Sequence, residues 1–177
     1  SDLVKETYDE LDKRSQGGGG LTGVSSGFRE LDNLTAGLQK GDLIIIAGRP
    51  SMGKTAFALN IAEHAALADE EPVAVFSMEM SASSLAQRMI SSLGRVNSHS
   101  MRTGKLEERD WNRIDGAIQQ IKNAPIYIDD TPSLTPIELR ARARRIQREK
   151  GLSLILIDYL QLMQVHGNKE NRATEIS

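Results

Sequence analysis

Cysteine is absent from the 177 residues of the chain, which excludes disulfide bonds and thiolate metal ligands. This composition fits a reducing compartment such as the cytoplasm. The only histidines, His64, His99 and His166, have no second ligand at zinc-like spacing, so we interpret them as ordinary surface or core residues. No apolar run approaches the roughly 20 residues that a membrane helix needs, and we expect no membrane partner.

Aromatic residues are scarce, at 4% of the chain, and the formal net charge is only -2. The chain as a whole is therefore not a polycation, and any contact with nucleic acid has to be local. Apolar residues make up 39% and charged residues 26%, which is typical of an ordinary soluble domain with one hydrophobic core.

The first segment, residues 1–15, is predicted to be an amphipathic linker helix. Its apolar positions recur at helical spacing: Leu3, Val4, Tyr8 and Leu11. The glycine-rich residues 16–20 follow, and we interpret them as a flexible tether. The apolar stripe then needs a partner, which is this domain, a neighbouring copy or another protein.

Residues 21–177 are predicted to form one α/β domain. Apolar runs predict strands at 42–48, 73–77, 124–130 and 152–158. Helical patterns alternate with them at 55–68, 81–94, 107–121 and 135–151, the last with Thr135 as its cap, Pro136 in its first turn and Gly151 as its stop. Apolar strands separated by helices predict a mostly parallel sheet with helices on both faces. The polar C-terminal tail resembles a loop and the start of a helix, as in part of a longer protein.

A phosphate-binding loop is the strongest motif. GRPSMGKT, residues 48–55, fits G-x-x-x-x-G-K-[ST] and lies between a predicted strand and a predicted helix. Gly48 and Gly53 allow a tight turn whose N–H groups, with the helix N-terminus, form an anion site. Lys54 provides charge for the β- and γ-phosphates, and Thr55 provides a hydroxyl for Mg²⁺. The motif predicts ATP and Mg²⁺ as cofactors.

An acidic residue is expected at the carboxyl end of a nearby strand, where it holds the metal through water. Asp158 ends the longer, uniformly aliphatic run and is favoured. Asp129 and Asp130 end another run and are interpreted as caps of the following turn.

Glu79 follows the strand predicted at 73–77, in the sequence FSMEM. A carboxylate there could orient or deprotonate the water that attacks the phosphate. A surface glutamate just beyond the strand explains the sequence equally well. The flanking Met78 and Met80 are interpreted as core residues.

Residues 140–150 are strongly basic. Leu139, Ala143 and Ile146 form an apolar stripe at helical spacing, so the basic side chains fan across the outer face. A solvated surface is the first interpretation, a subunit interface the second and nucleic acid the third.

Several segments together resemble bacterial replicative DNA helicases of the DnaB family: GRPSMGKT, FSMEM, RTG…W at 102–111, IYIDD, LTPIELRARARRI and LIDYLQLM. LIDYLQLM and FSMEM are far more specific than the phosphate loop. The resemblance implies a RecA-like P-loop ATPase domain, assembled as a hexamer, that moves 5′ to 3′ on single-stranded DNA and unwinds duplex at the fork. It also implies a primase and a helicase loader as partners, and a bacterial cytoplasmic location at the nucleoid.

The resemblance assigns roles to residues by position. It places these residues on the nucleotide phosphates: Ser51, Gly53, Lys54, Thr55 and Ala56. Glu79 matches the catalytic glutamate, Arg88 an arginine near the nucleotide, and Asp158 the metal-associated aspartate. The N-terminal helix matches one that docks on the adjacent subunit. A loop with Lys169 and Arg172 lies where a DNA-facing loop begins.

The family's remaining strands, its glutamine-bearing sensor strand, second DNA loop and trans-acting arginine are expected beyond Ser177, and its primase-binding domain upstream. Residues 1–177 alone are therefore expected to hydrolyse ATP poorly. Two other functions remain open: another RecA-like ATPase, such as a recombinase or a clock-type ATPase, and an assembly module that hydrolyses nothing.

Overall fold

The computed structural model describes residues 2–17, 20–159 and 161. The chain divides into two compact units, Ser1–Ile45 and Ile46–Ser177, and each is described by itself. Residues 18 and 19 of the predicted glycine tether lie outside the described residues.

The first unit begins with helix α1 (Asp2–Gln16), as its apolar spacing predicts. None of its residues is buried. The four apolar side chains of its stripe are 56–72% exposed: Leu3, Val4, Tyr8 and Leu11. An amphipathic helix with its apolar face uncovered is stabilised by little more than its own hydrogen bonds.

A second, short helix, α2 (Arg29–Thr35), was not predicted from the sequence. It is held by the buried carboxylate of Asp32, which accepts hydrogen bonds from the Ser26 amide at 2.9 Å and the Ser26 and Ser25 hydroxyls at 2.7 and 2.6 Å. Val24 and Leu38 form an isolated antiparallel bridge around it. These contacts join residues that are not adjacent in the chain, so no local periodicity reveals the helix.

The strand predicted at 42–48 is wrong for this structure, which forms no strand between Leu43 and Arg49. The side chains of Leu43 and Ile45 are 79% and 69% exposed. An apolar, β-branched run favours a strand, but the strand exists only where its N–H and C=O groups pair with a neighbour. The division between the two units falls inside this segment.

The second unit contains a parallel sheet of three described strands in the order β2-β1-β3. They are β1 (Val73–Ser77), β2 (Ile126–Asp129) and β3 (Leu154–Asp158), each within a predicted range. The register pairs Ser77 with Asp158 and Phe76 with Asp129. The carboxyl ends of all three strands therefore lie at one edge.

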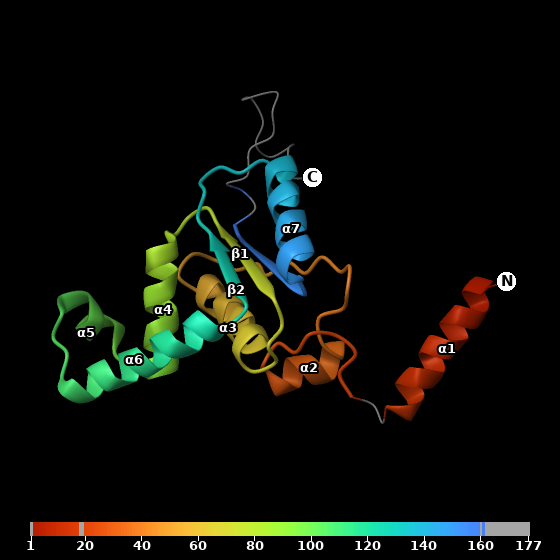
Figure 1. Ribbon diagram of the computed structural model, residues 1–177, viewed down its shortest axis with the longest axis horizontal. Coiled ribbons are helices and arrows are strands. Elements are labelled where there is room, and N and C mark those ends of the chain that lie inside the picture. Colours follow the sequence, from red (N-terminus) through yellow and green to blue (C-terminus); the bar gives the residue numbers. More distant parts are fainter. Residues whose placement is uncertain (1, 18–19, 160, 162–177) are drawn as a thin grey trace. The chain divides into compact units, whose positions relative to one another are not determined.

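Helices cover both faces of this sheet (Figure 1). On one face, α7 (Pro136–Lys150) packs its predicted apolar stripe against β1. The cluster contains Ala74, Phe76, Met78, Leu134, Leu139 and Ala143, with Ile146 packed against it. On the other face, Val75 of β1 lines a small cavity together with Leu59 of α3 (Lys54–Leu67) and Leu85 of α4 (Ala82–Gly94). The alternation of side chains along β1 thus gives each layer its own core.

The helix ends follow the expected capping chemistry. Thr135 forms a capping box with Glu138, Pro136 lies in the first turn, and Gly151 is the C-cap, as predicted. Ser81 caps α4 by accepting a hydrogen bond from the Ser84 amide. Helix α6 (Glu108–Asn123) was predicted and packs on α4, whereas the short α5 (Ser98–Thr103) was not predicted.

Glu63 is an unusual charge-bearing residue on α3, because it is only 6% exposed. Burial raises its pKa from 4.5 to about 7, partly offset by a hydrogen bond from the Ser92 hydroxyl. Below pH 4.5 the carboxyl is protonated in both the folded and unfolded states. Between these pKa values the unfolded chain ionises first, so the free energy of unfolding falls as pH rises and stays low above about pH 7.

We therefore expect Glu63→Gln to stabilise the protein at pH 8 by about 2–3 kcal/mol and to change little at pH 4. Urea unfolding at both pH values measures this, with the exposed Glu70→Gln as the matched control. An equal effect of Glu63→Gln at both pH values would contradict the raised pKa.

Candidate functional site

The glycine-rich loop turns sharply just before α3. Gly53 has φ 83° and serves as the N-cap of α3, while Ser51 also has positive φ, at 65°. A left-handed conformation at a serine is uncommon and is concentrated at functional loops. A Cβ at Gly48 would meet Lys54 Cγ at 3.3 Å, so a side chain at Gly48 would crowd this lysine.

The first turn of α3 carries Lys54, Thr55 and Ala56. The first amides of a helix have no partner within the helix, and its N-terminus is partially positive. The loop and this turn therefore offer several N–H donors and one ammonium group to an anion. Every residue that the motif assigns to the phosphates lies in this short stretch.

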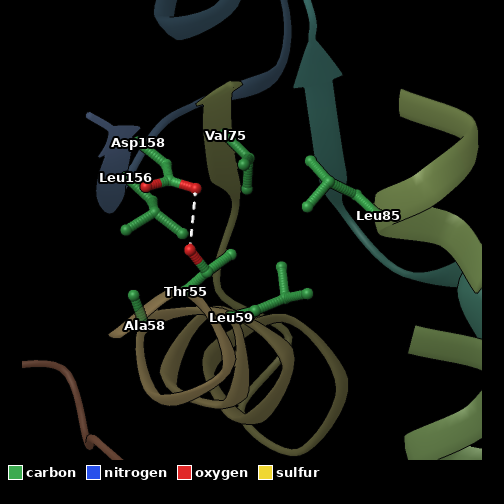
Figure 2. A pocket seen from close by; sticks show the side chains of 7 residues that line it. All are labelled: Thr55, Ala58, Leu59, Val75, Leu85, Leu156 and Asp158. Carbon is green, nitrogen blue, oxygen red and sulfur yellow. Dashed lines mark hydrogen bonds between the residues drawn. The ribbon is translucent and has the colours of Figure 1, made fainter. Parts of the chain in front are cut away.

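Thr55 and Asp158 come together across 103 residues of sequence. The Thr55 hydroxyl donates a hydrogen bond of 3.1 Å to Asp158 Oδ2 (Figure 2). Thr55 extends from the start of α3, and Asp158 is the last residue of β3. Both residues line a small apolar cavity of about 10 Å³, together with Ala58 and Leu156 among others.

Asp129 and Asp130, the alternatives to Asp158 as the metal-associated residue, bond other groups of the protein. Asp129 forms an ion pair of 2.6 Å with Arg142 and accepts a hydrogen bond from the Thr131 amide at 3.0 Å. Burial alone would raise the pKa of Asp129, but the hydrogen bonds from Arg142 and Thr131 and the charge of Arg142 outweigh it and lower the pKa. Asp130 accepts a hydrogen bond from the Ala82 amide at 2.8 Å. The carboxylate beside the phosphate loop is that of Asp158.

The donor set beside the loop fits Mg²⁺. A threonine hydroxyl and a carboxylate are oxygen ligands, and Mg²⁺ prefers one or two such protein groups together with water and substrate phosphates. Among the described residues no cluster of three histidine, aspartate or glutamate side chains could hold a metal alone. The pair is thus suited to a metal that arrives with a phosphate ligand.

The remaining predicted site residues lie as follows. Glu79 is exposed, two residues beyond the end of β1 and hence at the same edge of the sheet as Asp158. Arg88 is exposed on α4. Lys169 and Arg172 lie outside the described residues.

Two contacts near the site were missed in the sequence. The Tyr159 ring lies 5.9 Å from Lys54 Nζ, within the range of a cation–π contact. Arg142 was predicted as one of a solvated basic face, but it bonds Asp129 and the Thr131 hydroxyl, the latter at 2.7 Å. Tyr159 directly follows Asp158, and this position could have indicated its contact with Lys54. Nothing in the sequence indicates that Arg142 bonds Asp129 and Thr131.

In the described part of the chain, no helix combines the length and apolar character needed to cross a membrane.

A phosphate loop that opens a helix, next to the carboxyl edge of a parallel sheet covered by helices on both faces, defines a RecA-like P-loop nucleotide-binding domain. The chain belongs to the DnaB-like helicase C-terminal domain family, whose profile matches residues 23–177. The resemblance seen in the sequence is confirmed.

Several curated relatives align with almost the whole chain. Replicative DNA helicase DnaC of Bacillus subtilis (strain 168) is 49% identical over 177 residues, which are 99% of this chain and 39% of the relative. Replicative DNA helicase DnaB of Geobacillus stearothermophilus is 50% identical with the same coverage. The DnaB of Pasteurella multocida (strain Pm70) is 51% identical over 180 residues. The chain thus spans about two fifths of the length of these relatives.

Solved structures agree on the fold. One of them, described as an ATPase domain, superposes with a TM-score of 0.91 at 31% identity, covering 99% of this chain and 62% of that one. A DnaB-like replicative helicase, described with its interactions with primase, gives a TM-score of 0.87 at 31% identity and covers 99% of this chain and 42% of that one.

We expect Asp158→Asn, in the full-length protein, to raise the Mg²⁺ concentration for half-maximal ATP hydrolysis by about tenfold or more. The reason is that an amide attracts a metal-bound water less than a carboxylate does. A Mg²⁺ titration of ATPase activity measures this.

The matched control is Asp129→Asn. It should leave the Mg²⁺ requirement unchanged and lower the free energy of unfolding by about 0.5–1 kcal/mol, because it weakens the partly exposed Arg142 ion pair. The reverse pattern would make Asp129 the metal-associated residue.

Proposed function

We propose that the protein of which this chain forms part is an ATP-dependent replicative DNA helicase, and that this chain is its motor. The single observation that carries the proposal is the Thr55–Asp158 contact at the phosphate loop, in a chain that belongs to the DnaB-like family. Its relatives are named replicative DNA helicases, and this supplies the substrate class.

The phosphates of ATP bind the loop from Gly48 to Gly53 and the first turn of α3. Lys54 neutralises charge on the β- and γ-phosphates, and the N–H groups of the turn orient them. Thr55 and Asp158 would hold Mg²⁺. When bound, the metal supplies positive charge that offsets the charge of the phosphates.

Glu79 orients and deprotonates the water that attacks the γ-phosphate. Its position supports this role, because the register aligns Ser77 with Asp158 and Glu79 follows Ser77 by two residues. Its exposure leaves the carboxylate accessible to water and nucleotide. Arg88, further along α4, completes the nucleotide site.

The assembly is a homo-hexamer in which α1 docks on the adjacent subunit. The uncovered apolar stripe of α1 supports such docking, since a largely exposed stripe is stabilised by a partner surface. Closure of the site by the neighbour couples hydrolysis to 5′-to-3′ movement on single-stranded DNA, with Lys169 and Arg172 facing the DNA. Primase and a helicase loader are its partners, at the nucleoid in the cytoplasm.

In the full-length protein, we expect Glu79→Gln to keep ATP binding within about threefold and to lower turnover by about 10²–10³-fold, because the amide accepts no proton. Equilibrium binding of a fluorescent ATP analogue and steady-state ATPase assays measure the two effects. The control is Glu108→Gln, which changes an exposed glutamate on α6.

Forked DNA provides the functional readout. The wild-type protein should move along the strand that has a free 5′ tail and displace the complementary strand. The Glu79→Gln variant should unwind no duplex. Turnover of Glu79→Gln within a few-fold of wild type would remove Glu79 from the chemistry. Strand exchange in place of unwinding would favour a recombinase, and ATP binding without hydrolysis by the wild type would favour an assembly module.

A further inference from the structure

The loop between β1 and α4, residues 78–81, combines fixed neighbours with one exposed carboxylate. Met78 is only 8% exposed and packs in the core cluster with Phe76 and Leu134. Its amide donates a hydrogen bond of 2.9 Å to the carbonyl of Asp158, which extends the contact between β1 and β3 by one residue. Glu79, the next residue, is exposed.

Ser77 fastens the loop on the other side of Glu79. Its side chain is buried, and the residue is 1% exposed. The hydroxyl donates to the carbonyl of Met80 at 2.8 Å and accepts from the amide of Met80 at 3.2 Å. The Ser77 side chain therefore bonds both the N–H and the C=O group of Met80, three positions away. These two bonds form a tight turn that contains Glu79.

Asp130 fixes the far end of the loop from another strand. Its carboxylate accepts a hydrogen bond of 2.8 Å from the Ala82 amide, at the first residue of α4. This amide has no acceptor within the helix, and a carboxylate at a helix N-terminus is also favoured by the helix dipole. Asp130 follows directly after β2, so the loop is joined to that strand end as well.

We infer that Ser77 and Asp130 are positioning residues for Glu79: together they hold the loop so that this carboxylate is presented at a fixed place on the carboxyl edge of the sheet. The inference rests on the proposed role of Glu79. A glutamate side chain is flexible, so the placement of its carboxylate depends first on the backbone that carries it. A displacement of about 1 Å is enough to slow a positioned reaction by up to about 10²-fold.

A purely structural role for the two residues makes a different prediction. It lowers stability and leaves turnover of the folded protein unchanged. A positioning role lowers kcat and leaves KM for ATP nearly unchanged, because the phosphate loop lies on a different segment, residues 48–55.

The test uses Ser77→Ala and Asp130→Ala in the full-length protein, with kcat and KM for ATP measured at temperatures where each variant is folded. We expect each to lower kcat about tenfold and to change KM by less than about twofold. Asp130→Asn keeps an oxygen acceptor for the Ala82 amide and should return kcat to within about threefold of wild type. The control is Ser83→Ala, which removes an exposed hydroxyl from α4.

Asp130 is exposed, so its variants test the inference even where Ser77→Ala does not fold. Unchanged kcat in Asp130→Ala, or no recovery in Asp130→Asn, would overturn it.

Combination with Glu79→Gln separates this inference from the proposed function. In that background, single-turnover hydrolysis should fall by less than about twofold on adding Asp130→Ala, because the group being positioned is already lost. If Glu79→Gln lowers turnover as expected and Asp130→Ala still costs its full factor in that background, the positioning role alone is wrong. If Glu79→Gln itself keeps wild-type turnover, the proposed function of Glu79 fails, and this inference fails with it.

Discussion

The hydrogen bond between Thr55 and Asp158 is the contact on which the site depends. It joins the first turn of one helix to the last residue of a strand that lies 103 residues further along the chain. It forms only if α3 starts, and β3 ends, at the same edge of the sheet. The parallel register, with Ser77 opposite Asp158, brings β1 to that edge as well. A hydroxyl, a carboxylate and the loop after β1 then meet where the strands stop.

The two cores explain why that edge is held firmly. Side chains alternate along β1, so Ala74 and Phe76 pack under α7 while Val75 packs under α3 and α4. Both faces of the strand are therefore buried, and the strand's position is fixed by packing rather than by the site. Polar side chains lie at the carboxyl ends of β1 and β2, and this packing determines where those ends lie. Ser77, Asp129 and Asp130 each use their side chains to fasten neighbouring segments, and Glu79 is left exposed.

Features with local causes could be predicted from the sequence. The helix that starts at Pro136 was predicted by its cap, its proline and its glycine stop, and α3 was predicted by the loop motif and its periodicity. Asp158 was favoured because it ends the longer, uniformly aliphatic run, although the structure leaves Ile155 of that run 41% exposed. Features with long-range causes could not be predicted. Helix α2 depends on Asp32, and the segment at 42–48 is apolar enough for a strand but is unpaired. The ion pair of Asp129 with Arg142 and the contact of Asp130 with Ala82 depend on which segments the fold brings beside them, whereas the bond from the Thr131 amide to Asp129 is local and was predicted as a turn cap.

The most direct test of the central claim is an experimental structure of the full-length protein with Mg²⁺ and a non-hydrolysable ATP analogue. We expect a metal ligated by the Thr55 hydroxyl, with the Asp158 carboxylate on one of its waters and the Glu79 carboxylate facing the terminal phosphate. A metal held without Thr55 and Asp158, or a terminal phosphate on the side of the sheet edge away from Glu79, would contradict it.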